Sequence, residues 1–231
     1  MNRSVLVTGA GRRLGKEIAF HFAGQGFLVW LHFHHDQDEI DAVREKIAER
    51  GGMSEVVQAD LRNPVEIQRM FQIVGQSSQL SMLINNASVF YKSRLNNLSV
   101  ERWDEIFDVN LRAVWLCSIY AAEQMKKSEP GKGCIINISD SGAYQLWDEY
   151  GAYSLSRASV QTLSVLMAKT LAPSIRVNSI SPGLILADGE TDPETWEKLV
   201  RKTLVQHSGS PADLIEAVQY LAQSEYITGI D

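Results

Sequence analysis

Short apolar runs rich in β-branched residues alternate with longer amphipathic stretches along the whole chain, and this alternation restricts the folds open to it. The apolar runs predict strands at Ser4–Thr8, Phe27–Phe33, Glu55–Ala59, Met82–Asn85, Gly133–Ser139 and Ile175–Ile180. Helical periodicity predicts helices over Leu14–Ala23, Ile40–Glu49, Val65–Val74, Val100–Met125 and Tyr153–Leu171. Strands that are apolar throughout and separated by helices are typical of a parallel sheet covered on both faces.

The 231 residues contain no internal repeat, low-complexity segment or linker, so we expect one domain over residues 1–231. The predicted fold class is α/β: a single doubly wound Rossmann-type domain, with a parallel sheet and helices on both faces. Ligands of such domains bind outside the carboxyl ends of the strands, so the candidate site residues are those that follow the strands.

Composition and charge exclude several classes of protein. A formal net charge of −6 argues against a nucleic-acid partner, because such partners are usually met by a basic face. No run of about 18 or more apolar residues is present, so no membrane span is expected. The start, MNRSVLVTGAG, enters a strand pattern directly and lacks the shape of a signal peptide, which predicts a cytoplasmic protein. Cys117 and Cys134 lie far apart in apolar surroundings and are expected to be reduced core residues, with no metal site.

A glycine-rich turn follows the first predicted strand in the stretch TGAGRRLGKEIA. Gly9, Gly11 and Gly15 permit a tight turn that brings backbone N–H groups to a pyrophosphate, at the positive end of a helix beginning near Arg13. Because the trio stands between a strand and a helix, it predicts a dinucleotide site rather than a plain turn, and we expect Arg13 and Leu14 to take part in it.

The end of the second predicted strand bears on which dinucleotide is bound. A carboxylate that holds the ribose hydroxyls of NAD is usual there, and none occurs from Trp30 to His35. Arg13, His34 and His35 can instead surround a 2′-phosphate, which favours NADP(H), although a solvated loop is the alternative for the two histidines. Asp36 follows directly and would oppose a phosphate if it pointed inward.

Several motifs occur in the order of one known family. They are TGAGRRLG, ADL at 59–61, INNAS at 84–88, VN at 109–110, Tyr153 on its helix and RVNSISPG at 176–183. Together they resemble the short-chain dehydrogenase/reductase family over nearly the whole chain. Within it the sequence is most similar to the pteridine reductases and dihydromonapterin reductases, because of the RRLG turn, the aromatic residues in NNASVFY and an aspartate, Asp140, where serine is usual.

The resemblance implies roles for further residues. The implied cofactor contacts are Asp60 and Leu61 beside the adenine, Asn86, Ala87 and Ser88 along the cleft, and Pro182, Gly183 and Leu184 at the nicotinamide, with Tyr153 and Arg157 also in contact. Asn110 matches the residue that helps to position a water chain. Phe90 matches the aromatic that sandwiches a pterin ring against the nicotinamide, a stacking worth about 0.5–1.5 kcal/mol. Packing under a loop is the alternative for Phe90, and Tyr91 is a second candidate.

Tyr153 is the expected proton donor, and a nearby cation would lower its pKa by favouring the phenolate. The family places a lysine four residues later, on the same helix face, and this chain has Arg157 there. Arginine keeps the charge, but it is longer, planar and never gives up its proton. We therefore expect hydride transfer to survive at a reduced rate.

Asp140 stands 13 residues before Tyr153, at the end of the fifth core strand. An ionised carboxylate cannot stabilise a developing oxyanion, but a carboxyl group can relay a proton to a ring nitrogen or accept hydrogen bonds from an amino-pyrimidine edge. Asp140 thus favours a nitrogen heterocycle over a ketone. A turn-forming aspartate is the alternative reading, and a register error of one residue would put Ser139 or Ser141 in its place.

The catalytic residues expected are therefore Asp140, Tyr153, Arg157 and Asn110, and the substrate-binding residues are Phe90, Asp140 and Tyr153. The function expected is NADPH-dependent reduction of a pterin or dihydropterin. The alternatives are a short-chain reductase of a carbonyl compound, and a weakly or non-catalytic NADP(H)-binding scaffold, which Arg157 supports.

The last part of the chain leaves two readings open for residues 184–209: a mobile lid over a small-molecule substrate, or a surface helix with solvated charges. Ser210 and Pro211 are expected to cap and begin a helix. The family resemblance implies a homo-oligomer, a tetramer or dimer, through helix faces around Trp115 and Val160. Family members usually continue beyond ITGID with about a strand and a glycine-rich tail, so the subunit geometry stays open.

Overall fold

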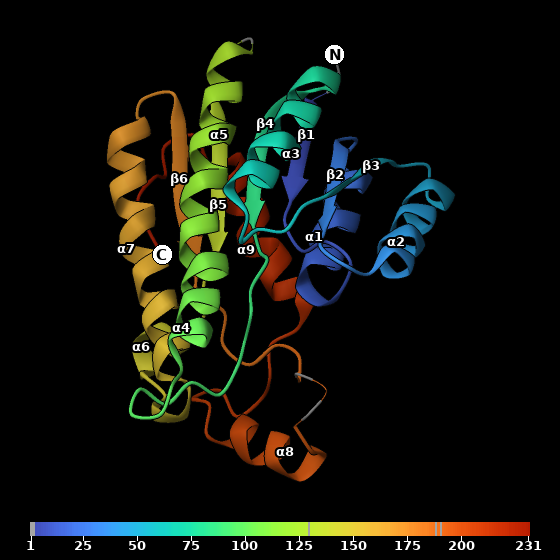
Figure 1. The fold of residues 1–231 in the computed structure, drawn as a ribbon. Helices are drawn as coiled ribbons and strands as arrows, with labels where there is room; N and C mark the ends of the chain where they lie inside the picture. Colours follow the sequence, from blue (N-terminus) through green and yellow to red (C-terminus); the bar gives the residue numbers. More distant parts are fainter. Residues whose placement is uncertain (1–2, 129, 188, 190) are drawn as a thin grey trace.

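A single parallel sheet forms the centre of the computed structural model, which describes residues 3–128, 130–187, 189 and 191–231. Within these residues the strands are β1 (Arg3–Val7), β2 (Leu28–Phe33), β3 (Met53–Gln58), β4 (Gln79–Asn85), β5 (Gly133–Ile138) and β6 (Ile175–Ile180). Their spatial order is β3-β2-β1-β4-β5-β6, and every adjacent pair is parallel (Figure 1). The chain reverses its strand order between β1 and β4, where ligands of such sheets bind.

Helices cover both faces of the sheet, as the apolar strands predict. One layer contains α1 (Arg13–Gly24), α2 (Gln37–Glu49) and α9 (Pro211–Gln223); the other contains α3 (Pro64–Ser77), α4 (Val100–Phe107), α5 (Ala113–Lys127) and α7 (Gly151–Leu171). Each layer has its own hydrophobic core against the sheet. Two short helices, α6 (Gly142–Gln145) and η2 (Asp148–Tyr150), precede α7, and α8 (Pro193–Arg201) lies beyond the carboxyl ends of the strands (Figure 1).

The single helix predicted over Val100–Met125 is wrong in one respect. A π-helical turn, η1 (Asp108–Arg112), separates α4 from α5. Such a turn inserts one extra residue into the hydrogen-bonding ladder, and periodicity in a sequence does not reveal it. Its middle residue, Asn110, is buried, and the turn directs that side chain toward the loop after β4.

Other local predictions are confirmed. The Ser210 hydroxyl and the Asp213 carboxylate form a reciprocal capping box at the start of α9, with Pro211 as its first residue. Cys117 and Cys134 are buried and free, and burial raises their thiol pKa to about 12 and about 11. In the described part of the chain no helix is both long and apolar enough to cross a membrane.

Candidate active site

The glycine turn after β1 is held by contacts with two other strands. A Cβ on Gly15 would lie 2.1 Å from the Gly9 carbonyl oxygen and 2.6 Å from Asn86 Nδ2, so α1 approaches the turn at a distance that only glycine permits. The Asn86 amide donates to the carbonyls of Thr8 at 2.9 Å and Gly9 at 3.1 Å. The motifs TGAG and NNAS are thereby bonded to each other at the carboxyl ends of β1 and β4.

His32 fixes the same turn from β2, a role that the sequence motifs did not reveal. Its Nδ1 accepts the Gly9 N–H at 3.0 Å, so the proton is on Nε2, which donates to the Ala59 carbonyl at 3.1 Å. Burial lowers the pKa of His32 to about 4 and keeps the ring neutral. A histidine in an otherwise apolar strand was the only signal for this role.

Arg13 and Leu14 lie at the start of α1, as predicted, but their side chains leave the turn in different directions. The Arg13 guanidinium donates to the Ala187 carbonyl at 2.5 Å and to the Leu186 carbonyl at 3.0 Å. Arg13 also has a left-handed φ of 51°. Leu14 packs against the hydrophobic core. Arg13 thus ties the glycine turn to the segment after β6.

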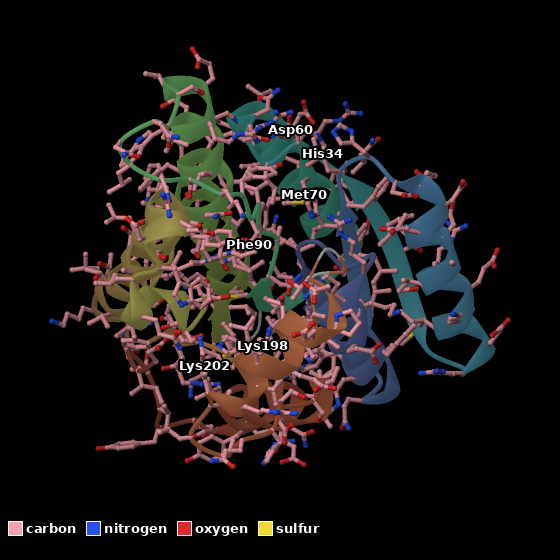
Figure 2. All side chains as sticks on the ribbon, turned by 90° about the horizontal axis from the view of Figure 1, so that it is seen from below. His34, Asp60, Met70, Phe90, Lys198 and Lys202 are labelled. Carbon is pink, nitrogen blue, oxygen red and sulfur yellow. The ribbon has the colours of Figure 1, made fainter. Side chains whose placement is uncertain are left out.

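His34 lies beside Asp60, the residue predicted to flank the adenine (Figure 2), and His35 packs against His34. The two imidazole rings have centroids 3.3 Å apart and planes tilted by 35°, and His34 Nε2 lies 3.5 Å from the Asp60 carboxylate. Hydrogen bonds from Arg62 lower the pKa of Asp60 to about 2, while burial lowers the pKa of His34. The Asp36 carboxylate caps α2 by accepting the Glu39 N–H.

The remaining residues of the predicted cofactor cleft follow β3, β4 and β6. Leu61, which the resemblance places beside the adenine, packs its side chain in the hydrophobic core. Ala87 is half-buried and donates its N–H to Thr8 Oγ1, and Ser88 is exposed beside it. In the strand-end loop of β6, the Pro182 carbonyl accepts the Ser141 N–H, the Leu184 carbonyl accepts the Gly209 N–H, and Gly183 is exposed.

Asp140 and Tyr153 are in direct contact. The Tyr153 hydroxyl donates to Asp140 Oδ2 at 2.9 Å, and Asp140 Oδ1 accepts the Gly142 N–H at 2.6 Å. The neighbouring hydroxyl of Ser139 instead donates to the Arg157 carbonyl. The spacing of 13 residues therefore brings the aspartate, and not the serine before it, to Tyr153.

Arg157 lies under Tyr153, as the spacing of four residues predicts, with its guanidinium carbon 5.2 Å from the ring centroid. Burial nevertheless raises the pKa of Tyr153 to about 12, with Arg157 acting in the opposite direction. The expectation that the cation brings this pKa below its ordinary value is wrong for the ligand-free site, because burial outweighs the charge. Burial also raises the pKa of Asp140, against the hydrogen bond from Gly142.

Asn110 uses its whole amide to hold the loop after β4. Its Oδ1 accepts the Val89 N–H at 2.9 Å, and its Nδ2 donates to the Val89 carbonyl at 3.0 Å and to Ser156 Oγ at 3.2 Å. The side chain therefore joins the loop to α7.

Phe90, one residue further along that loop and labelled in Figure 2, packs edge-on against Tyr153. Its ring centroid lies 4.7 Å from that of Tyr153, and it stacks on Tyr150 at 4.5 Å with an interplanar angle of 4°. Phe90 is 40% exposed, so it is not buried under the loop. Tyr91 turns away and packs under the Arg102 guanidinium, which leaves Phe90 as the aromatic at the site. Tyr150 is a site residue that the motifs did not reveal.

The segment 184–209 carries α8, whose residues Pro193–Arg201 are nowhere buried. Asp192 caps the helix by accepting the Thr195 N–H. Lys198 and Lys202 mark this segment in the view onto the carboxyl ends of the strands (Figure 2). Residues 188 and 190 lie outside the described residues.

The helix face predicted for subunit contact includes Trp115 but not Val160. Trp115 is 46% exposed, whereas Val160 is fully buried. The exposed face carries a groove of about 670 Å³ between α4, α5 and α7, lined among others by Phe107, Leu111, Trp115, Leu155, Leu163 and Leu166.

The chain is similar in sequence to known reductases. A family model described as Enoyl-(Acyl carrier protein) reductase matches residues 9–231. The 3-oxoacyl-[acyl-carrier-protein] reductase FabG of Staphylococcus aureus (strain Mu50 / ATCC 700699) is 31% identical over 235 residues, covering 99% of this chain and 95% of that protein. The NADPH-dependent aldehyde reductase-like protein, chloroplastic, of Arabidopsis thaliana is 30% identical over 247 residues, covering 98% and 90%.

Two solved structures are similar over almost the whole chain. The FolM Alternative dihydrofolate reductase 1 from Brucella canis, complexed with NADP, has a TM-score of 0.91 and 32% identity, covering 99% of this chain and 90% of that chain. The Brucella suis protein of the same name, in complex with NADP, has a TM-score of 0.88 and 33% identity, covering 99% and 92%. The chain belongs to the short-chain dehydrogenase/reductase family of oxidoreductases.

Proposed function

We propose that the protein is an NADPH-dependent reductase of a pterin or dihydropterin ring. The observation that carries this proposal is the 2.9 Å hydrogen bond from Tyr153 to Asp140, beside the exposed ring of Phe90. A carboxyl group at this position suits protonation of a ring nitrogen, whereas an ionised carboxylate would repel the oxyanion formed from a ketone. The similarity to the two Brucella dihydrofolate reductases supports the same substrate class.

The residues present fit a dinucleotide. Arg157 is 2% exposed, its Nη1 donates to the Ile138 carbonyl at 3.4 Å, and its Nε has no hydrogen-bond partner among the residues that the structure describes. A buried donor without a partner is costly, and ribose hydroxyls in the cleft would satisfy it. The glycine turn and Asn86 would hold the pyrophosphate end, with His34 and His35 near the adenosine phosphate. When bound, NADPH supplies the hydride.

Proton transfer is the part of the reaction that this chain performs. Tyr153 donates its proton to the ring nitrogen, and a protonated Asp140 replaces that proton across the 2.9 Å hydrogen bond. Burial helps Asp140 to hold a proton, because it raises the pKa of that carboxyl. Arg157 stabilises the transient phenolate by its charge, and Phe90 stacks on the flat substrate.

A second candidate function is reduction of a carbonyl compound, which the similarity to 3-oxoacyl and aldehyde reductases favours. The purified protein is incubated with NADPH and biopterin, dihydrobiopterin or dihydromonapterin, and then with a panel of ketones, 3-oxoacyl thioesters and aldehydes. Turnover of pterins supports the proposal, and turnover of carbonyl compounds alone rejects it. Binding of NADPH with no turnover of either class would identify a non-catalytic scaffold.

The assembly and the lid belong to the same proposal. The groove around Trp115 would pair with a second copy of the chain, and light scattering measures the resulting size. Residues 184–209 would close over the substrate, since α8 has no buried residue to anchor it.

A further inference from the structure

Helix α7 carries Tyr153 and Arg157, yet no side chain of its own caps its first turn. The residue before the helix, Tyr150, makes no capping side-chain hydrogen bond. The first N–H groups of any helix lack intrahelical partners, and a first turn without a cap frays. A frayed first turn would displace the Tyr153 hydroxyl from Asp140.

Ser93, from the loop after β4, supplies the missing partners. Its hydroxyl oxygen accepts the Tyr153 N–H at 3.3 Å, and its carbonyl accepts the Ala152 N–H at 3.2 Å. Its own N–H donates to the Glu149 carbonyl at 2.7 Å. Ser93 is 1% exposed, so water does not replace these bonds.

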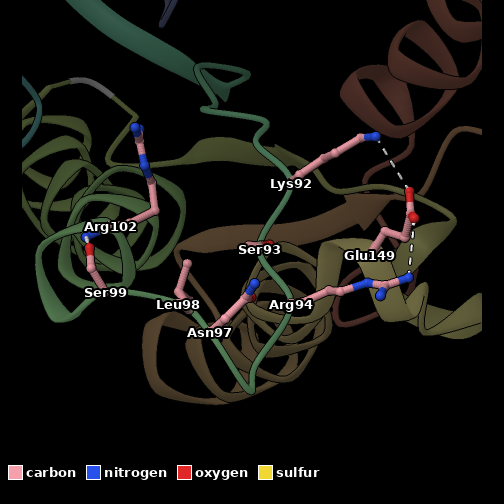
Figure 3. Close-up of a pocket in the computed structure, with 8 residues that line it drawn as sticks. All are labelled: Lys92, Ser93, Arg94, Asn97, Leu98, Ser99, Arg102 and Glu149. Carbon is pink, nitrogen blue, oxygen red and sulfur yellow. Dashed lines mark hydrogen bonds and ion pairs between the residues drawn. The ribbon is translucent and has the colours of Figure 1, made fainter.

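Charged neighbours hold Ser93 at this position. Lys92 and Arg94, on either side of it, both pair with Glu149, at 3.6 Å and 3.2 Å (Figure 3). These pairs are exposed and individually weak, but they converge on the carboxylate that precedes α7. The other end of the loop is held by Asn110, which bonds both backbone groups of Val89. The loop residues between these two anchors include Phe90.

We propose that Ser93 is a positioning residue that fixes Tyr153 relative to Phe90 by capping α7 from outside the helix. The same loop then carries both Phe90 and Ser93, so the position of Phe90 relative to Tyr153 is fixed. The capping role stands on the geometry alone, and only its catalytic consequence rests on the proposed function.

The test compares Ser93→Ala with Ser99→Ala. Ser93 and Ser99 line one pocket (Figure 3), and the Ser99 hydroxyl accepts the Arg102 N–H at 3.2 Å to cap α4. Amide hydrogen exchange of Ala152 and Tyr153, followed by NMR, reports capping without any substrate. Exchange there should accelerate about five- to tenfold in Ser93→Ala and not in Ser99→Ala.

Kinetics with NADPH and dihydrobiopterin give the second readout. In Ser93→Ala, kcat should fall about five- to tenfold with the KM for NADPH unchanged, and Ser93→Thr, which keeps the hydroxyl, should restore it. Unchanged exchange at Tyr153, or an equal loss of kcat in Ser99→Ala, overturns the proposal. If the wild type reduces no pterin, the proposed function fails while the exchange measurement still decides the role of Ser93.

Discussion

The two ends of the cleft are built differently. At the cofactor end, the glycine turn is held through backbone groups: His32 accepts the Gly9 N–H, Asn86 donates to the Gly9 carbonyl, and Gly15 leaves no space for a Cβ. At the end proposed to donate the proton, side chains converge from separate segments, namely Phe90, Asp140 and Tyr153. Backbone contacts tolerate no added atom, whereas side chains can be exchanged one at a time. A single substitution at the first end should therefore abolish NADPH binding, whereas substitutions at the second end should lower turnover by different amounts.

The largest effect is expected at Gly15. In Gly15→Ala the new Cβ would meet the Gly9 carbonyl at 2.1 Å, which forces α1 away from the turn, so NADPH binding should be lost and the protein destabilised. Fluorescence titration and thermal unfolding measure both. Gly24→Ala is the matched control in the same helix, because its Cβ meets nothing within 4 Å. If Gly15→Ala still binds NADPH, the glycine turn can accept an added Cβ and the proposed difference between the two ends is wrong.

Tyr153→Phe should separate the two ends. Removing the hydroxyl deletes the proton donor, and kcat should fall about 10²–10⁴-fold. The affinity for NADPH should stay within about twofold, since the ring and its contact with Phe90 remain. Stopped-flow turnover and fluorescence titration give the two values. A parallel loss of NADPH affinity would show that the ends are not independent.

The pH dependence of turnover should follow Asp140. Burial raises the pKa of this carboxyl, so its protonated form is present at low pH and is lost as pH rises through that pKa. Pterin turnover should fall over the same interval, and Asp140→Asn should be slow at every pH. The native state holds this proton more tightly than the unfolded chain does, so the wild type should also lose stability relative to Asp140→Asn as pH rises. Identical pH profiles for the two proteins would remove Asp140 from the proton route.

Arg157→Lys should raise kcat by a few fold. A lysine ammonium is compact and its donors rotate, so it should bond the ribose and relay a proton through water better than a planar guanidinium. Arg157→Met is the comparison without charge, and its kcat should fall. Steady-state kinetics with NADPH and dihydrobiopterin measure both variants. A lower kcat in Arg157→Lys would mean that the site is adapted to arginine.

The smallest effect is expected at His34. Burial lowers the pKa of its ring, so a positive charge for a 2′-phosphate appears only as pH falls. The preference for NADPH over NADH should therefore grow toward low pH, and His34→Gln should reduce that growth by about two- to threefold. Competitive titrations between pH 5.5 and 8 measure it, with those limits chosen around the free pKa of about 6.5. A preference for NADH at all pH values would exclude a phosphate pocket here.

Sequence alone was enough for the sheet, the helix layers and the meeting of Asp140 with Tyr153, because periodicity and motif spacing act along the chain. The sequence did not reveal contacts between side chains and segments that are far apart along the chain. No motif points to His32, Ser93 or Tyr150, since the role of each depends on which segment lies opposite it. The π-helical turn at Asp108–Arg112 was also not predicted, and Asn110 in its middle accepts the Val89 N–H across the chain.

The pKa of Tyr153 was misjudged because sequence shows the charge of Arg157 but not the burial of both groups. Val160 was assigned to an exposed face for a related reason, since a helix between a sheet and solvent has apolar residues on both sides.

The loop after β4 is fastened in three places: by Asn86 to the glycine turn, by Val89 to Asn110 and by Ser93 to α7. A loop held at three points along its length is not expected to move as a lid. Under the proposed function, passage of substrate in and of product out would therefore fall to the segment around α8, and substitutions there should alter the rate of product release without altering the chemical step.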